Sequence, residues 1–187
     1  MAEFTTYGLA GARMDRIAAR AAVNKAMIYY YFSSKAELHR QIITETFEPI
    51  LARLRTAFED EADVSAVLAR FSDVYFEHLY RQPELRPLLL RELAEPDSRV
   101  VGMVAEAIVE SGVLRRAVGM FQRKIDEGFF RSVDVPQALI SFMLMNVGYV
   151  LLAPLIEKVW ATIDRDELLV RRKQSLLDLF LYGVMKR

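Results

Sequence analysis

Apolar residues recur with a helical period along most of this 187-residue chain, and this pattern restricts its fold more than any other feature. The clearest stripe lies between residues 64 and 80. It consists of Val64, Val67, Leu68, Phe71, Val74, Tyr75, His78 and Leu79. No segment keeps up the alternation of apolar and polar residues that is typical of a strand. The pattern therefore predicts an all-α protein of about nine helices, with three short helices in the first third and longer ones after them.

Helix start signals agree with this prediction. Capping boxes, in which a Ser or Asp is followed three residues later by Glu or Gln, occur at three places. They are Ser34 with Glu37, Asp134 with Gln137, and Asp164 with Glu167. We therefore expect a helix to begin directly after each of these caps.

The composition fits a folded protein with a large apolar interior. Apolar residues make up 53% of the chain and charged residues 27%, which excludes intrinsic disorder. The chain contains no cysteine, which excludes disulfides and thiolate metal sites and favours a reducing cytoplasm. The formal charge is zero, but residues 1–40 hold six basic against three acidic residues. This modest excess of positive charge points to the N-terminal end as the place where a nucleic acid would bind.

Two short helices separated by a tight turn are predicted between Met14 and Tyr31. The turn lies at Ala22 and Val23, and Asn24 is a good N-cap for the second helix. This arrangement is typical of a helix-turn-helix, whose second helix enters the DNA major groove N-terminus first. The residues that would then face the base edges are Asn24, Lys25, Ala26 and Met27.

Three adjacent tyrosines, Tyr29, Tyr30 and Tyr31, end the second of these helices. Neighbouring positions on a helix differ by about 100°, so the three rings cannot all lie on one buried face. Ile28 and Phe32 are four residues apart and are expected to hold the helix to its own core. We therefore expect Tyr30 and Tyr31 to be exposed, whereas burial of Tyr29 is left open as an alternative.

The segment from Phe4 to Leu38, FTTYGLAGARMDRIAARAAVNKAMIYYYFSSKAEL, resembles the DNA-binding domain of the tetracycline-repressor (TetR) family. Many fixed positions of the family pattern are matched at the right spacing. They are Phe4, Gly8, Met14, Ile17, Ala18, Ala21, Val23, Tyr29, Tyr31, Phe32, Lys35 and Leu38. The resemblance implies a three-helix helix-turn-helix domain at residues 1–45 and a helical ligand-binding and dimerisation domain at residues 46–187.

The resemblance also implies roles for residues on and near the second helix of the motif. The positions that contact phosphates in the family match Tyr29, Tyr31 and Lys35. The positions that approach bases or the groove wall match Lys25, Ala26, Met27 and Tyr30. The chemistry agrees, because a tyrosine hydroxyl donates to phosphate from a rigid stem, and a lysine in the first turn of a helix calls for an external negative charge.

Three departures from the family pattern bear on this domain. Ala22 replaces the turn glycine, at a cost of about 1 kcal/mol if the residue must be left-handed. Arg13 replaces the Ser or Thr that caps the helix beginning at Met14, so that cap is missing and Arg13 could reach a phosphate instead. Family members also carry further residues before the position of Phe4, so the first helix is expected to be truncated here.

For the rest of the chain, the resemblance implies only a helical domain with a ligand cavity. Several aromatic, methionine and polar residues lie on helices that could surround one space. They are Phe71, Tyr75, His78, Met103, Phe121, Phe142, Met145, Asn146 and Tyr149. A mostly apolar pocket with a few polar groups is the usual form of a small-molecule site. The alternative, that these are ordinary core residues at helical spacing, stays open at this point.

The resemblance further implies a homodimer formed by the last two helices, and the sequence supports this. Residues 139–152 are apolar all round, and the final helix carries a row of large apolar residues. Helices of this kind can pack on their own core and on a twin subunit. The residues predicted for the dimer interface are Leu151, Leu169, Leu176 and Phe180.

Other classes of function are disfavoured. The chain has no phosphate-binding glycine loop, no G-x-S-x-G and no H-E-x-x-H, so we expect neither an enzyme nor a metal or cofactor site. Residues 135–156 are uncharged and long enough to span a membrane. However, Gln137, Asn146 and Pro154 and the weak flanking charge favour a helix buried between a core and a partner subunit.

These features together predict a cytoplasmic, ligand-responsive transcriptional regulator. We expect a repressor that binds a palindromic DNA operator as a homodimer and is released by a small, mostly apolar effector. The alternative is a dimeric helical ligand- or protein-binding protein that has lost DNA recognition.

Overall fold

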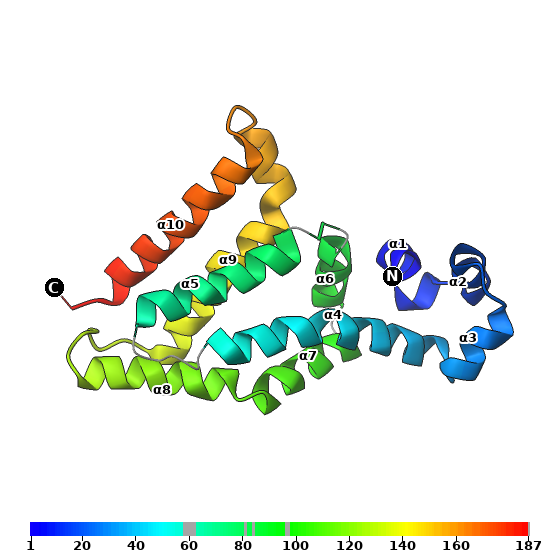
Figure 1. Cartoon of the computed structure of the whole chain (residues 1–187), viewed down its shortest axis with the longest axis horizontal. Helices are drawn as coiled ribbons and strands as arrows, with labels where there is room; N and C mark the ends of the chain where they lie inside the picture. The colour runs from blue at the N-terminus through cyan, green and yellow to red at the C-terminus, as the bar shows by residue number, and fades with distance from the viewer. Residues whose placement is uncertain (58–62, 81, 84, 96–97, 187) are drawn as a thin grey trace. The chain divides into compact units, whose positions relative to one another are not determined.

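The computed structural model describes residues 1–57, 63–80, 82–83, 85–95 and 98–186 (Figure 1). Within these residues the chain forms ten α-helices and one π-helical segment, and its only β-structure is an isolated bridge between Phe130 and Met185. The all-α fold expected from the helical periodicity is therefore confirmed.

The chain divides into two compact units. The N-terminal unit comprises residues 1–49 and 82–106, and the C-terminal unit comprises residues 50–81 and 107–187. The sequence suggested two consecutive segments, whereas this division places residues 82–106 with the N-terminal unit. One boundary between the units falls within helix α4 (Lys35–Ala57), and another falls within helix α7 (Arg99–Glu110).

The N-terminal unit contains the helix-turn-helix and the helices that pack against it. These are α1 (Ala2–Gly11), α2 (Met14–Ala21), α3 (Lys25–Tyr31), the first part of α4, and α6 (Leu85–Ala94) with the start of α7. The buried residues of the helix-turn-helix core are Phe4, Ala12, Met14, Ala18, Ile28 and Leu38. Because Ile28 is in this core and Phe32 packs against it, the two residues attach α3 to its domain as expected.

Two backbone positions with positive φ shape this unit. Ala22 has φ 53° and ψ 37°, so the turn between α2 and α3 is left-handed without a glycine. The Val23 amide donates to the Ala18 carbonyl at 3.1 Å, which closes the end of α2. Gly8 has φ 66° and kinks α1, and a Cβ there would lie 2.9 Å from a guanidinium nitrogen of Arg91. Arg91 in turn donates to the Thr6 carbonyl at 3.0 Å and fastens α1 to α6.

The C-terminal unit contains the rest of α4 and α7, together with α5 (Val64–Tyr75), α8 (Val113–Asp126), α9 (Val135–Val159) and α10 (Arg165–Val184). The predicted capping residues act as expected. The Asp134 carboxylate accepts from the Gln137 amide at 3.1 Å, and the Asp164 carboxylate accepts from the amides of Asp166 and Glu167. α9 and α10 form a helical hairpin with a short connection (Figure 1).

A chain of aromatic rings links four helices of this unit. Phe142 of α9 lies 5.5 Å from Phe71 of α5 and 4.8 Å from Phe180 of α10, measured between ring centroids. Phe180 also contacts Phe121 of α8, with the centroids 6.0 Å apart. Rings at these separations add to the stability of the core beyond their buried area.

The helix expected over residues 64–80 changes its period near its end. The α-helix stops at Tyr75, and Phe76–Tyr80 continues as a π-helical turn. The wider turn buries Phe76 and Tyr80, whereas His78, which the α-helical period placed inward, is only partly buried. Over these last five residues the predicted stripe is therefore confirmed at Leu79 and wrong at His78, and it missed Phe76 and Tyr80.

Candidate nucleic-acid interface and ligand cavity

The recognition helix α3 exposes nearly all of its side chains. The Asn24 side chain accepts from the Ala26 amide at 2.8 Å and caps the helix as predicted. Ile28 is the buried residue of α3, whereas Met27 is half exposed. Because a seven-residue helix of this kind buries little of its own surface, α3 is available for contact with another molecule.

The three tyrosines differ in exposure along α3. Tyr30 is 84% exposed and Tyr31 is 68% exposed, while Tyr29 is 44% exposed. The rings of Tyr30 and Tyr31 pack edge to face with their centroids 5.2 Å apart. The expected exposure of this pair is therefore confirmed, and these rings face solvent together rather than the core.

Lys25 is tied to the neighbouring helix of the motif. Its ammonium lies 2.8 Å from a carboxylate oxygen of Asp15 on α2, and the hydrogen bond with Asp15 raises the pKa of Lys25. This contact joins the start of α3 to the start of α2. A DNA phosphate or base acceptor would have to compete with the Asp15 carboxylate for this ammonium.

Lys35 has two internal partners that the sequence did not suggest. Its ammonium donates to the carbonyl oxygens of Ala10 and Ala12, both at 3.0 Å, at the C-terminal end of α1. Carbonyls at the C-terminal end of a helix carry partial negative charge. The end of α1 therefore supplies part of the negative charge that the sequence analysis expected an external partner to bring to Lys35. An ammonium has three N–H donors, and the third is not used by these two bonds.

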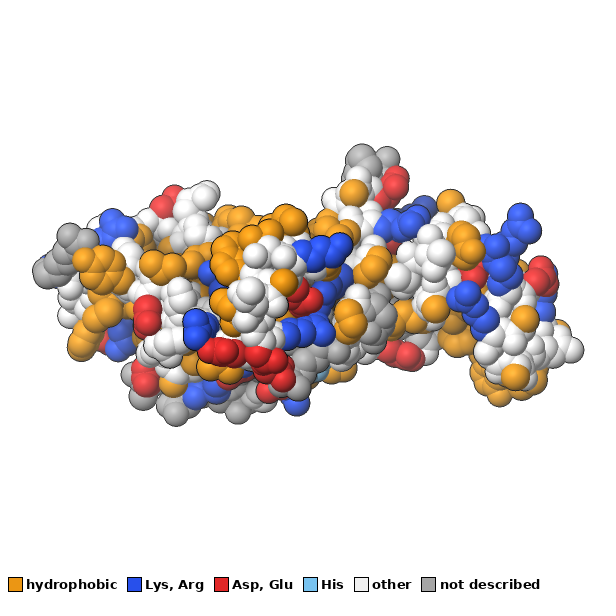
Figure 2. All heavy atoms as spheres, turned by 90° about the horizontal axis from the view of Figure 1, so that it is seen from above, with side chains coloured by type: hydrophobic (Ala, Val, Ile, Leu, Met, Phe, Trp, Pro, Cys, Tyr) orange, Lys and Arg blue, Asp and Glu red, His pale blue; other side chains and the backbone are white. Residues whose placement is uncertain are grey.

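Arg13 lies at the N-cap of α2 and makes no side-chain cap, as the sequence indicated. Its side chain is exposed. Lys and Arg side chains gather at the α1–α3 end of the chain in Figure 2. Exposed tyrosine rings next to basic groups are a suitable surface for a phosphate backbone.

The C-terminal unit contains an apolar cavity of about 260 Å³. Its walls come from α4, α5, α7, α8 and α9, and all the lining residues except Tyr75 are apolar. Burial raises the pKa of the Tyr75 hydroxyl to about 12. The cavity can thus hold a small apolar group, with a neutral phenol as its polar contact.

Four of the predicted ligand-binding residues line this cavity, namely Phe71, Tyr75, Phe121 and Phe142. Three others line neither this cavity nor the open groove described below, namely His78, Asn146 and Tyr149. Met145 lines that groove, and Met103 lines a cavity within the N-terminal unit. The prediction that these nine residues surround one space is therefore wrong. The helical period shows that a residue lies on an apolar face, but it does not show which faces of different helices line the same cavity.

Sequence reasoning missed the aliphatic part of the lining. The missed residues are Leu51, Leu54, Leu68, Ile108, Val113, Leu114, Ala117, Met120, Pro136, Leu139, Ile140 and Met143. These residues have the same spacing as ordinary core residues, so no signal in the sequence could have separated them from the core.

Asn146 is fully buried beside the aromatic core. Its amide nitrogen donates to the Phe142 carbonyl at 2.8 Å, while its side-chain oxygen has no hydrogen-bond partner among the described residues. The Tyr149 hydroxyl and the His78 Nδ1 atom are also buried without a partner in the part of the chain that the structure describes. None of these three residues lines the apolar cavity.

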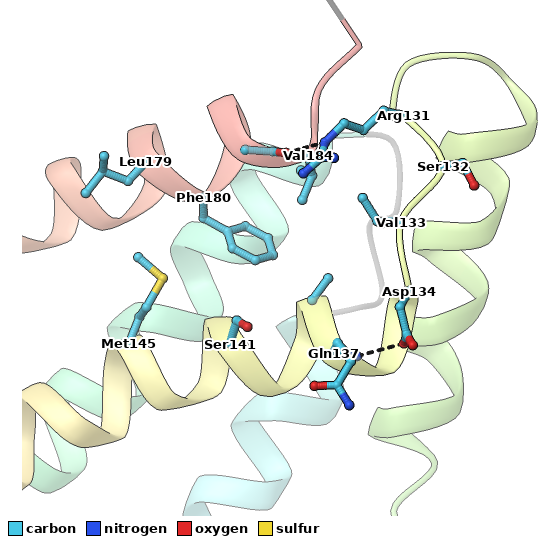
Figure 3. Close-up of a pocket in the computed structure, with 12 residues that line it drawn as sticks. Arg131, Ser132, Val133, Asp134, Gln137, Ser141, Met145, Leu179, Phe180 and Val184 are labelled. Carbon is cyan, nitrogen blue, oxygen red and sulfur yellow. Dashed lines mark hydrogen bonds between the residues drawn. The ribbon is translucent and has the colours of Figure 1, made fainter.

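An open groove of about 540 Å³ lies at the end of the α9–α10 hairpin (Figure 3). Its main polar groups already have internal partners. The Arg131 guanidinium donates to the Gly183 carbonyl at 2.6 Å, and Asp134 caps α9. Phe180 points between the two helices, with Met145 and Leu179 beside it (Figure 3). The groove is thus the place where the loop before α9 is fastened to the end of α10.

The predicted dimer residues mostly face the interior of their own unit. Leu169, Leu176 and Phe180 are at most 6% exposed, so they belong to the protomer's core, and Leu151 is partly buried. The large apolar residues that α9 and α10 do expose are Ile140, Met143, Leu144, Leu152, Leu155, Val159, Val170, Leu179 and Tyr182. The sequence analysis thus identified the two helices that carry an apolar outer face. The residues that it selected on α10, however, lie on the inner face of that helix.

The fold and these two sites define a class of protein. It is an all-α chain with a helix-turn-helix of the DNA-binding type in one unit and an apolar cavity in a second, helical unit. Residues 1–42 match the family described as bacterial regulatory proteins, tetR family, so this N-terminal segment resembles a DNA-binding domain of that family. Within the described residues, no group of three or more His, Asp or Glu side chains is placed to hold a metal ion.

Two known proteins with similar sequences are transcriptional repressors by name. The chain is 36% identical over 92 residues to the HTH-type transcriptional repressor SCO4008 of Streptomyces coelicolor, covering 49% of this chain and 44% of the relative. It is 30% identical over 137 residues to the HTH-type transcriptional repressor NicS of Pseudomonas putida, covering 68% of this chain and 60% of the relative. The chain thus spans less than two thirds of the length of either relative.

Solved structures share the whole fold. The FadR regulator of Bacillus subtilis, solved in complex with stearoyl-CoA, superposes with a TM-score of 0.70 at 21% identity, over 97% of this chain and 93% of FadR. At this level of identity the likeness establishes the fold of both units.

Proposed function

We propose that the chain is a ligand-responsive DNA-binding transcriptional regulator of the cytoplasm, acting as a repressor, and that it is not an enzyme. The observation that carries this proposal is the capped recognition helix α3, which exposes Tyr30 and Tyr31 while Ile28 attaches it to the domain. Two relatives are named transcriptional repressors, which supports repression over activation.

DNA recognition follows from the position of α3 in a helix-turn-helix. The N-terminal residues of α3, from Asn24 to Met27, face the base edges of the major groove. Tyr29, Tyr31 and Arg13 lie beside the groove and contact phosphates, and the third N–H of Lys35 does the same. Tyr30 approaches the groove wall.

A homodimer supplies two such helices for a palindromic operator. In α9, the exposed residues Leu144, Leu152, Leu155 and Val159 recur at spacings of three, four and eight residues and so lie on one face. Only 28% of the most apolar stretch of α9 is buried within the chain. α9 is long and apolar enough to cross a membrane. A second copy of the chain that covers this face explains such a helix without a membrane.

The effector is a small, mostly apolar molecule bound in the apolar cavity. The lining of that cavity supports this, and FadR provides a relative by fold whose structure holds stearoyl-CoA. Binding of the effector weakens DNA binding, and by reciprocity DNA weakens effector binding by the same factor.

A selection of genomic DNA fragments on the purified protein tests the DNA-binding part. Enriched fragments should share a palindrome, and the Tyr31→Phe and Lys35→Ala variants should bind it more weakly. Lys35→Ala should also lower the salt slope by about one. Lys158→Ala, an exposed lysine of α9, is the control and should leave affinity and slope unchanged. Failure of the unaltered protein to enrich any fragment would support the alternative, a helical binding protein without DNA recognition.

The effector site is tested by filling the cavity. Ala117 is a buried residue of its wall, so Ala117→Phe should abolish the response of operator binding to an apolar effector while leaving effector-free DNA binding intact. Ala105→Phe, on the exposed side of α7, is a matched control that should retain the response. An unchanged response in Ala117→Phe would place the effector elsewhere.

A further inference from the structure

Glu3 of α1 is an acidic side chain buried at the start of the helix-turn-helix. It is only 2% exposed. One of its carboxylate oxygens accepts from the backbone amide of Arg13 at 3.2 Å and from the Arg16 guanidinium at 2.6 Å. The other oxygen lies 3.9 Å from a guanidinium nitrogen of Arg20. All three partners belong to α2 or to its N-cap.

The first of these bonds fills a position that α2 itself leaves empty. Arg13 is the N-cap residue of α2 and has no side chain that can cap the helix. In a capping box, a Glu in the first turn reaches back to the N-cap amide. Glu3 makes this same bond from another helix, and its negative charge lies next to the positive end of the α2 dipole.

The orientation of α2 matters because α2 supports the recognition helix. Met14 and Ala18 of α2 lie in one core with Ile28 of α3. Asp15 of α2, two residues after the N-cap, holds Lys25 at the start of α3. A displacement at the first turn of α2 is therefore passed on to the first turn of α3.

We propose that Glu3 is a positioning residue for DNA recognition: it caps α2 from α1 and thereby fixes the orientation of α2 and α3. Its effect on DNA binding rests on the proposed function, whereas its effect on α2 does not. The residue makes no contact with DNA in this role, because it is buried.

The electrostatics of Glu3 agree with this geometry. Burial raises the pKa of its carboxyl, but the hydrogen bonds from Arg13 and Arg16 and the charges of Arg16 and Arg20 outweigh burial and lower the pKa overall. A carboxyl with a lowered pKa in the folded state stabilises the fold at neutral pH, and this contribution is lost as the pH falls through the folded-state pKa. The first turn of α2 should therefore loosen in acid.

A simple counterion role for Arg16 is the competing explanation. Removal of one partner of a buried ion pair is itself destabilising because the other charge is left unpaired, so a loss of stability on removing Glu3 would not identify the cap. The two roles differ in what restores the protein. A serine at the N-cap can accept from an amide of the first turn, at residue 15 or 16, and so stabilise the start of α2 in place of Glu3, but it cannot replace a counterion.

The experiment compares Glu3→Leu with two double variants, Glu3→Leu/Arg13→Ser and Glu3→Leu/Arg13→Ala. Both double variants remove the Arg13 guanidinium, but only Ser offers a capping oxygen. Amide hydrogen exchange of residues 14–17 is measured in the free protein. Glu3→Leu should speed this exchange by about three- to tenfold, Arg13→Ser should reverse the effect, and Arg13→Ala should not.

One further variant, Glu3→Gln, and a second use of the double variants keep the proposal open to contradiction. In Glu3→Gln, an acceptor remains but the charge is lost, so residues 14–17 should lose the acid dependence of their protection. If Glu3→Leu unfolds the unit, the Ser double variant should refold it and the Ala double variant should not. Equal exchange in Glu3→Leu and the unaltered protein, or equal recovery with Ser and Ala, would overturn the proposal.

Operator affinity is measured on the same proteins. It should fall in Glu3→Leu, and Glu3→Leu/Arg13→Ser should match the single Arg13→Ser variant. If no DNA is bound by the unaltered protein, the proposed function fails, while the exchange data still decide whether Glu3 caps α2. If exchange changes as expected but operator affinity does not, Glu3 is a cap without a role in recognition, which overturns the positioning proposal.

Discussion

Two helices, α3 of the N-terminal unit and α9 of the C-terminal unit, expose apolar side chains of different kinds. The first exposes three tyrosines along a seven-residue helix that begins at Lys25. The C-terminal unit exposes aliphatic residues such as Leu152 and Leu155 along a 25-residue helix. Rings with hydroxyl tips keep their hydrogen bonds at a wet, charged surface, whereas an aliphatic stripe gains free energy only against another apolar surface. This difference supports the proposal that the first surface meets nucleic acid and the second meets protein.

The largest expected effect concerns the aliphatic stripe. Leu155→Glu places a carboxylate on the exposed face of α9, so a symmetric dimer would bury two unpaired charges at about 3–5 kcal/mol each. The dissociation constant of the dimer should rise by about a thousandfold or more, as measured by sedimentation velocity. Leu93→Glu is a control of similar exposure on α6 and should leave the dimer intact. A Leu155→Glu protein that stays dimeric would remove this face from the interface.

The next effect separates the inner and outer sides of α3. Ile28→Ala should lower the free energy of unfolding by about 2–5 kcal/mol because Ile28 is buried in the helix-turn-helix core. Tyr30→Ala should leave that free energy nearly unchanged, because Tyr30 is exposed, and should weaken operator binding about tenfold. Chemical denaturation and DNA titration of both variants provide the measurements. A large loss of stability in Tyr30→Ala would mean that the ring belongs to the fold rather than to an interface.

A smaller effect concerns Tyr75 in the wall of the apolar cavity. Its hydroxyl has a pKa of about 12, above the ordinary value of 10.0, because it is buried. The folded state therefore holds this proton more tightly than the unfolded state, and stability should fall as the pH rises from about 10 towards 12. Tyr75→Phe should reduce this alkaline loss, as followed by circular dichroism. Tyr182→Phe, an exposed tyrosine of α10, should leave it unchanged.

The smallest effect concerns His39 in the N-terminal unit. Burial of His39 lowers its pKa, and the Glu92 carboxylate, 3.5 Å away, opposes this only in part. The unfolded chain takes up the proton more readily, so the free energy of unfolding should decline as the pH falls below about 6.5. The proton uptake on unfolding that causes this decline is less than one proton per molecule. Thermal unfolding of His39→Gln should lose this decline, and unfolding of His78→Gln should retain it. The same decline in both variants would assign it to other groups.

The local features of the N-terminal unit could be predicted from the sequence. The turn at Ala22, the cap at Asn24 and the burial of Ile28 depend on residues within a few positions of each other, and they were found as expected. The start sites of α4, α9 and α10 followed from capping boxes for the same reason. The roles of the tyrosines and of Lys35 at DNA remain predictions.

The contacts between distant segments could not be predicted. The carboxylate of Glu3 meets the amide of Arg13, and Lys35 meets the carbonyls at the end of α1, across 10 and 25 positions of the chain. The π-helical turn at Phe76–Tyr80 broke a period that looked continuous. No spacing rule brings such groups together, because their meeting depends on how whole helices pack.

The sequence by itself determined that this protein is helical, where most of its helices begin, and which helix carries an exposed row of tyrosines, because caps and periods act over a few residues. The tertiary structure decided which apolar side of α10 faces inward, which residues surround the apolar cavity, and which side chains cap α2 and α1. An apolar residue is equally suited to a core, a cavity wall and an interface, and only the packing of neighbouring helices assigns it to one of them.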